Sequence, residues 1–195
     1  METNPYAAPA AQLEETVELQ PTFYVVSIPK FTILYVATLG FYELYWFYAN
    51  WKRYRDHTGE DLWPVPRAIF SIFFAHLLFS RIQEKLSQRE INFGWAPGHV
   101  AALYVIFAVL SNVLDRVAAK EIWSPEADVL SLLFIVPVFY ALLTAQKAVN
   151  LAEGREAVAT NDRLTWVNAV WIALGLLMWA LTILGLLMIF GLVDV

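Results

Sequence analysis

Residues 38–51 read TLGFYELYWFYANW, and this stretch decides what kind of protein the chain forms. It is apolar and strongly aromatic, and Glu43 is its single acidic residue. Three basic residues, Lys52, Arg53 and Arg55, come directly after it. An apolar, aromatic helix that ends in a basic cluster is typical of a segment that crosses a membrane and stops at the headgroups.

The composition of the whole chain also indicates an integral membrane protein. Of the 195 residues, 59% are hydrophobic and 16% are charged, whereas a soluble domain has about 45–50% apolar and about 25% charged residues. The absence of cysteine excludes disulfides and thiolate metal sites. The net charge of -5 argues against nucleic acid as a partner, and no basic cluster with interleaved, exposed aromatic residues occurs outside the membrane flanks.

Four apolar stretches predict transmembrane helices: residues 31–51, 100–114, 129–144 and 164–193. The first would be about 31 Å long as a helix, which is enough to cross a bilayer. Pro137 is expected to kink the third. A fifth stretch, residues 68–79, would be only about 18 Å long and is too short to span. The sequence therefore predicts an all-α integral membrane protein with four transmembrane helices plus one short re-entrant or interfacial helix.

The remaining polar segments predict the domain organisation and the orientation in the membrane. Residues 1–24 are acidic, contain prolines and lack Lys and Arg, which predicts a disordered acidic leader. Residues 25–195 then form a single helical membrane domain. With four spans, the positive-inside rule places both termini outside, with all 13 basic residues inside except Lys30, Arg116 and Lys120.

The string TLGFYELYWFYANWKRYRD resembles a family of small, uncharacterised bacterial multi-pass membrane proteins that is classed as a domain of unknown function. The segment PVPRAIFSIFF, the pentad QKAVN at 146–150 and NDRLTWVN at 161–168 are similar to further parts of that family. The resemblance covers most of the chain from about residue 23 onward. It implies a location in the bacterial cytoplasmic (inner) membrane, and it implies no activity and no catalytic residue.

Four polar residues in or near the apolar stretches are candidates for an intramembrane polar site: Glu43, His76, Asn50 and Asn112. An acid deep in a membrane helix is costly unless it is paired, hydrated or protonated, so Glu43 is a candidate proton or ion site. The alternatives are a position near headgroup water and a simple interhelical hydrogen bond. We expect Glu43 to face protein. Glu43 is also a candidate partner for His76, although His76 as a packing residue is the other interpretation.

The sequence carries no recognisable catalytic or metal-binding motif. Asp56, His57, Glu60 and Asp61 offer oxygen and nitrogen ligands at close spacing, but Gly59 among them is typical of a polar turn. Neither HExxH, GxSxG nor a phosphate-binding glycine loop occurs. The prediction is therefore a protein that is not an enzyme and has no cofactor and no metal.

Three functional hypotheses follow. The first is a non-enzymatic scaffold, assembly or accessory factor whose partners are the lipid bilayer and other membrane proteins, or further copies of itself. The alternative is a small oligomeric transporter or channel that uses Glu43 and His76. The third is a lipid-modifying enzyme, for which residues 56–61 would be the only cluster of acids and histidine at a membrane face.

Overall fold

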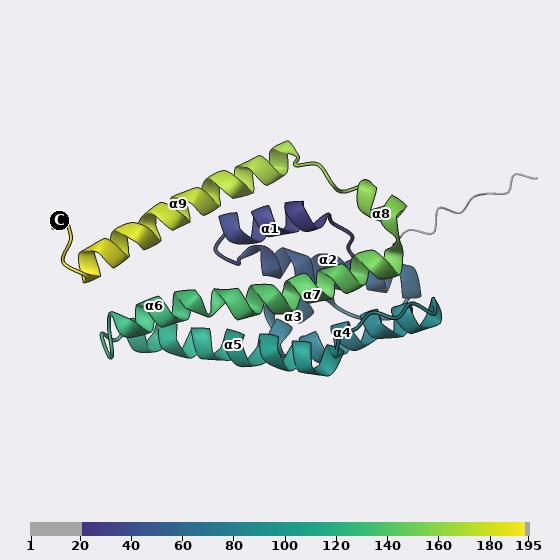
Figure 1. Cartoon of the computed structure of the whole chain (residues 1–195), viewed down its shortest axis with the longest axis horizontal. Coiled ribbons are helices and arrows are strands. Elements are labelled where there is room, and N and C mark those ends of the chain that lie inside the picture. Colours follow the sequence, from purple (N-terminus) through teal and green to yellow (C-terminus); the bar gives the residue numbers. More distant parts are fainter. Residues whose placement is uncertain (1–20, 194–195) are drawn as a thin grey trace, which may run out of the picture.

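Figure 1 shows the computed structural model of the chain, which describes residues 21–193. Within that range every regular element is a helix, so the all-α prediction is confirmed for the described residues. The helices are α1 (Ile28–Ala37), α2 (Tyr42–Thr58), α3 (Pro64–Ile69), α4 (Ser71–Gln88), α5 (Pro97–Ala118), α6 (Glu126–Leu133), α7 (Ile135–Glu153), α8 (Arg155–Ala159) and α9 (Trp166–Ile189).

Three helical segments in the described range are long and apolar enough to cross a membrane. They are α5, the pair α6–α7 taken together (Glu126–Glu153), and α9, and they contain the second, third and fourth predicted spans. The pair divides at Phe134, whose φ of -71° and ψ of -11° remain helical. Pro137 explains the division, because it cannot donate a hydrogen bond to Leu133 and its ring crowds that carbonyl. Three such segments are compatible with a membrane protein.

The predicted first span, residues 31–51, is not one continuous helix. Leu39 has a φ of 51° and Gly40 a φ of 86°, both in the left-handed region that a right-handed helix excludes. Thr38 stabilises the break, because its Oγ1 donates to the Leu34 carbonyl at 2.8 Å and accepts from the Tyr42 N–H at 3.0 Å. The predicted span is therefore divided into α1 and α2, joined at residues 38–41, which we call the hairpin tip.

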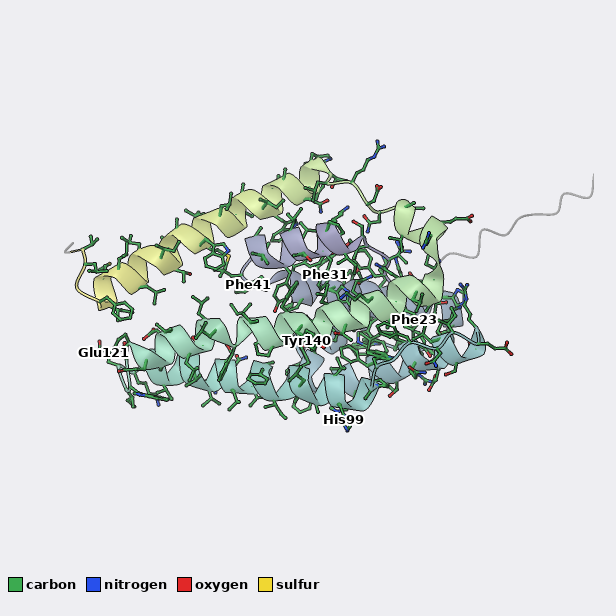
Figure 2. The ribbon with its side chains drawn as sticks, in the orientation of Figure 1. Phe23, Phe31, Phe41, His99, Glu121 and Tyr140 are labelled. Carbon is green, nitrogen blue, oxygen red and sulfur yellow. The ribbon has the colours of Figure 1, made fainter. Side chains whose placement is uncertain are left out.

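Helices α1 and α2 run in opposite directions and form a helical hairpin. The Phe31 ring of α1 lies 6.5 Å from the Trp46 ring of α2. Phe23, before α1, stacks at 5.7 Å on Tyr54, near the end of α2. Figure 2 shows Phe23 toward one end of the molecule and Phe41 at the tip, with Phe31 between them. Both ends of the hairpin thus lie at the same end of the molecule, which is the geometry of a re-entrant hairpin.

The stretch predicted not to span, residues 68–79, forms the end of α3 and the first half of α4. The charged sequence that follows continues α4 to Gln88. Helix α4 is not among the segments of the described chain that are apolar and long enough to cross a membrane. The start of this stretch nevertheless exposes large apolar side chains, including Phe70 and Phe73. Helix α4 thus combines an apolar, exposed start with a charged second half.

An extended segment, Thr22 to Val26, passes through the core without belonging to a helix. All five of its side chains are buried, and Phe23 and Val26 are completely inaccessible. The predicted leader ends at residue 24, so its last residues belong to this buried segment. Residues 1–20 of that leader lie outside the described range. The segment holds the start of the hairpin against α7, since the Phe23 N–H donates to Glu153 Oε1 at 3.0 Å.

Candidate functional site

A cavity of about 600 Å³ lies between the hairpin tip and the three segments that can cross a membrane. Helices α5, α6, α7 and α9 form its walls, and the tip and the first turn of α2 close one side. Its polar lining consists of Glu43, Ser111, Asn112, Asp115, Asp128, Ser131 and Thr182. Aromatic and aliphatic side chains, among them Tyr35, Phe41, Phe134, Met178 and Leu186, form the rest. The cavity is therefore both apolar and acidic.

The non-helical backbone at the tip makes some of its hydrogen bonds within the chain, and the rest of it faces this cavity. The Gly40 N–H donates to the Tyr35 carbonyl at 2.9 Å, and the Phe41 N–H donates to the Thr38 carbonyl at 3.0 Å. Leu39, Gly40 and Phe41 all line the cavity. At membrane depth, irregular backbone occurs only where protein buries it or where it lines a hydrated cavity. The tip backbone is therefore accounted for by internal hydrogen bonds and by its place in the cavity lining.

Glu43 occupies the first turn of α2, immediately after the tip, and its side chain lines the cavity. A carboxylate in this position is favoured by the positive end of the helix dipole. Its neighbours are the buried Tyr35 and Tyr104, and the Tyr104 hydroxyl is fixed by a 2.6 Å hydrogen bond with Ser71 Oγ. Glu43 thus faces protein and the cavity, with no basic partner within salt-bridge distance in the described chain.

Two further carboxylates, Asp115 and Asp128, line the same cavity. Asp128 accepts a 2.7 Å hydrogen bond from Ser124 Oγ, which fixes its side chain beside the start of α6. Among the described residues, the lining includes no lysine, arginine or histidine. The cavity lining thus contains three acidic side chains and, among the described residues, no basic counterpart.

The structure separates the four predicted polar-site residues. Glu43 and Asn112 line the cavity, and Asn112 donates to the Ala108 carbonyl at 2.8 Å. His76 is exposed on α4 and is not in the lining, so the two candidates Glu43 and His76 do not share this site. Asn50 is completely buried in a different place.

Asn50 belongs to a group of amide side chains that satisfy the backbone of the extended segment. Its Oδ1 accepts from the Tyr24 N–H at 3.1 Å. Gln146 Nε2 donates to the Tyr24 carbonyl at 3.2 Å, and Asn150 Nδ2 donates to the Val26 carbonyl at 2.8 Å. Asn161 Nδ2 donates to the Val25 carbonyl at 2.8 Å. These four side chains replace the hydrogen bonds that a helix or sheet would supply.

Sequence reasoning missed the contributions of α6 and α9 to the cavity, namely Asp128, Ser131 and Thr182. A signal for the α5 wall was present, because Asn112 and Asp115 are three residues apart and share a helix face. For α6 and α9 the sequence contains no comparable pair. Their place in the cavity depends on how the helices pack.

Two of the four possible ligands at residues 56–61 have other partners. Asp56 pairs with Arg55 at 2.7 Å. Glu60 accepts a 2.8 Å hydrogen bond from the Tyr54 hydroxyl and lies 3.7 Å from Arg81. No three of the described His, Asp and Glu side chains form a group that could hold a metal ion.

Comparison of the chain with protein-family models, with curated proteins and with solved structures finds no match. The resemblance drawn from the sequence motifs therefore stays a prediction. A function has to be inferred from the cavity and its acidic lining.

Proposed function

We propose that the protein is a small multi-pass protein of the bacterial cytoplasmic membrane that binds a cationic ligand in the cavity at the hairpin tip and acts as a transporter or channel. The observation that carries this proposal is the position of Glu43. It follows the break between the two helices of an apolar hairpin and faces a cavity with two further acids. Broken helices with polar groups near mid-membrane are the usual sites of substrate and ion binding in transporters.

A re-entrant hairpin leads to a topology with three crossings. The N-terminus then lies inside and the C-terminus outside, in place of the four-span arrangement with both ends outside. Of the 13 basic residues, all except Arg116 and Lys120 fall on the inner side. This arrangement satisfies the positive-inside rule better than four spans do, and it does not require the acidic leader to cross the membrane. The cavity then opens toward the outer end, where Asp115 and Asp128 lie close to the α5–α6 turn.

The lining also defines the class of ligand. Carboxylates favour a positive charge, whereas Leu39, Leu44 and Met178 favour an apolar body. Aromatic side chains such as Phe41 and Phe134 provide faces that attract a cation. A monovalent organic cation with an apolar body fits these properties, and a volume of about 600 Å³ accommodates a small molecule of that kind.

Ethidium binding to the full-length protein in lipid nanodiscs tests the proposal, with Glu43→Gln as the variant. We expect the wild type to bind ethidium and the variant to bind it at least about tenfold more weakly, because a buried charge-assisted contact is lost. Glu156→Gln on α8 is the matched control, since Glu156 is exposed and outside the cavity. Absence of binding by the wild type, or equal binding by Glu43→Gln, would refute the proposal.

Ethidium flux into proteoliposomes then separates transport from binding alone. Flux that depends on Glu43 is the expected result for a transporter or channel. Binding that depends on Glu43 without any flux would show that the cavity is a binding site and would refute the proposal of transport.

The second candidate function is a scaffold, assembly or accessory factor. The surface of α9 favours it, because Gly175 is the only buried residue of this 24-residue helix. Lipid or a partner helix must cover the remaining apolar surface. A photo-crosslinking residue at Leu181, which is 60% exposed, tests this function. Crosslinks to lipid alone would count against a protein partner at α9.

A further inference from the structure

Arg67 of α3 is held between side chains of two other helices. Its guanidinium carbon lies 4.5 Å from the centre of the Trp51 ring of α2 and 5.2 Å from the centre of the Phe74 ring of α4. Arginine stacked on aromatic rings keeps its N–H donors in one plane and in one orientation. The guanidinium is thus preorganised as a rigid fork of hydrogen-bond donors.

Within the described part of the chain, this fork has no acceptor. Arg55 pairs with Asp56 and Arg81 pairs with Glu84, but no carboxylate lies within salt-bridge distance of Arg67. No side-chain hydrogen bond of Arg67 occurs there either. A second donor beside it is also unsatisfied, because Trp51 Nε1 is buried and has no partner among the described residues. Buried donors without acceptors are rare in proteins, and the half-buried Arg67 keeps part of its fork open to an acceptor from outside the chain.

The surface around Arg67 is apolar and exposed. Trp63, directly before α3, is 73% exposed, and Phe73 at the start of α4 is 72% exposed. Three further exposed apolar side chains lie on α3 and between these helices: Val65, Ile69 and Phe70. A ligand that matches the donor fork of Arg67 and the apolar surface around it needs an anionic group with acceptor oxygens and long apolar chains.

We propose that Arg67 binds the phosphate of an anionic phospholipid, whose acyl chains lie along the exposed apolar surface of α3 and the start of α4. Arginine is the residue best suited to this group, because its donors match two phosphate oxygens at once. Arg55 and Arg81 are engaged by carboxylates and Arg53 lies over the Tyr24 ring, whereas Arg67 lies beside the exposed apolar surface with its donors free to recognise the headgroup. The site is separate from the cavity at the hairpin tip, and it does not depend on the proposed function.

Native mass spectrometry of the full-length protein in detergent micelles tests this inference. Phosphatidylglycerol and phosphatidylcholine with the same acyl chains are titrated separately, so that only the headgroup differs. We expect the wild type to retain one phosphatidylglycerol at a concentration about tenfold lower than it needs for phosphatidylcholine. The preference should disappear in Arg67→Gln and be reduced in Arg67→Lys, which keeps the charge and loses the fork.

Arg89→Gln is the matched control, because Arg89 is an exposed basic residue at the end of α4. It should bind phosphatidylglycerol as the wild type does. A wild type without headgroup preference would overturn the inference, whatever the variants do and even if Arg67→Gln does not fold. Equal loss in Arg89→Gln would also overturn it, since general charge would then explain binding. Displacement of the lipid by excess inorganic phosphate would show that the site selects phosphate alone, and it would overturn the assignment to a phospholipid.

Discussion

Substitution of Gly175 tests how α9 is attached to the rest of the molecule. A Cβ atom at this position would overlap the Ala37 carbonyl oxygen and lie 2.7 Å from the Ala37 carbonyl carbon. Nearby, Trp179 Nε1 donates to the Val36 carbonyl at 2.8 Å. Both contacts join α9 to the last turn of α1. At Gly185, further along α9, a Cβ atom would meet no other atom within 4 Å, so this glycine offers the same substitution without the overlap.

The expected effects of Gly175→Ala and Gly185→Ala have opposite signs. Alanine stabilises a helix relative to glycine by about 0.5–1 kcal/mol, which is the whole effect expected at Gly185. At Gly175 the methyl group meets backbone that cannot rotate away, so the cost is near the upper end of about 1–3 kcal/mol for overpacking. The Trp179 hydrogen bond, worth about 1 kcal/mol, is lost as well. The net expectation for Gly175→Ala is destabilisation by about 3 kcal/mol.

Unfolding in mixed micelles with increasing SDS, followed by circular dichroism, measures both variants against the wild type. The two variants should differ by about 4 kcal/mol in free energy of unfolding. If Gly175→Ala is as stable as Gly185→Ala, then α9 does not contact α1 at this glycine. Helix α9 would then not form this wall of the cavity, and the cavity that the acidic side chains line would be open on that side.

Two further predictions concern the core and the topology. Gln146→Leu removes the acceptor of Trp46 Nε1 and should destabilise the fold by about 3 kcal/mol or more in the same assay, because buried polar groups lose their partners. The control Gln88→Leu, at the exposed end of α4, should change stability by less than about 0.5 kcal/mol. In intact cells, a membrane-impermeant maleimide should label Ala119→Cys and not Thr16→Cys. Labelling of Thr16→Cys from outside would mean that the hairpin crosses the membrane.

The sequence alone was sufficient for the parts of the fold that depend on length and hydropathy. Residues 100–114, 129–144 and 164–193 all lie within or around helices long enough to span, because a continuous apolar run in a membrane has no alternative to a helix. The interruption near Pro137 was also predictable, since proline acts locally. The short stretch at 68–79 was excluded as a span by length, and its charged continuation extends α4 to Gln88.

The hairpin tip was not predictable from the same properties. Residues 31–51 are long enough to span and contain a single charged residue, Glu43, and length and charge do not distinguish one long helix from two short ones. Gly40 was the single local signal, and it is equally compatible with close helix packing. Leu39 carries no signal, because leucine rarely adopts a φ of 51° and its identity therefore does not predict one. The cavity depends on this break, so the position of Glu43 in it could not be derived from the sequence.

The role of Asn50 shows why polar residues in apolar helices are ambiguous when only the sequence is known. Asparagine and glutamine at membrane depth usually bond between helices, and Asn50 and Glu43 were both candidates for the intramembrane polar site. In the structure the two residues have different surroundings, since Glu43 lines the cavity and Asn50 is buried elsewhere. Asn50 accepts from the backbone of the extended segment, and Gln146 and Asn150 donate to it. That segment has no helical or sheet partner, so its N–H and carbonyl groups would be unsatisfied in the core without these amides. The amides are thus accounted for by the fold, whereas Glu43 lies in the cavity lining beside Tyr35 and Tyr104, and the proposed ligand site depends on that position.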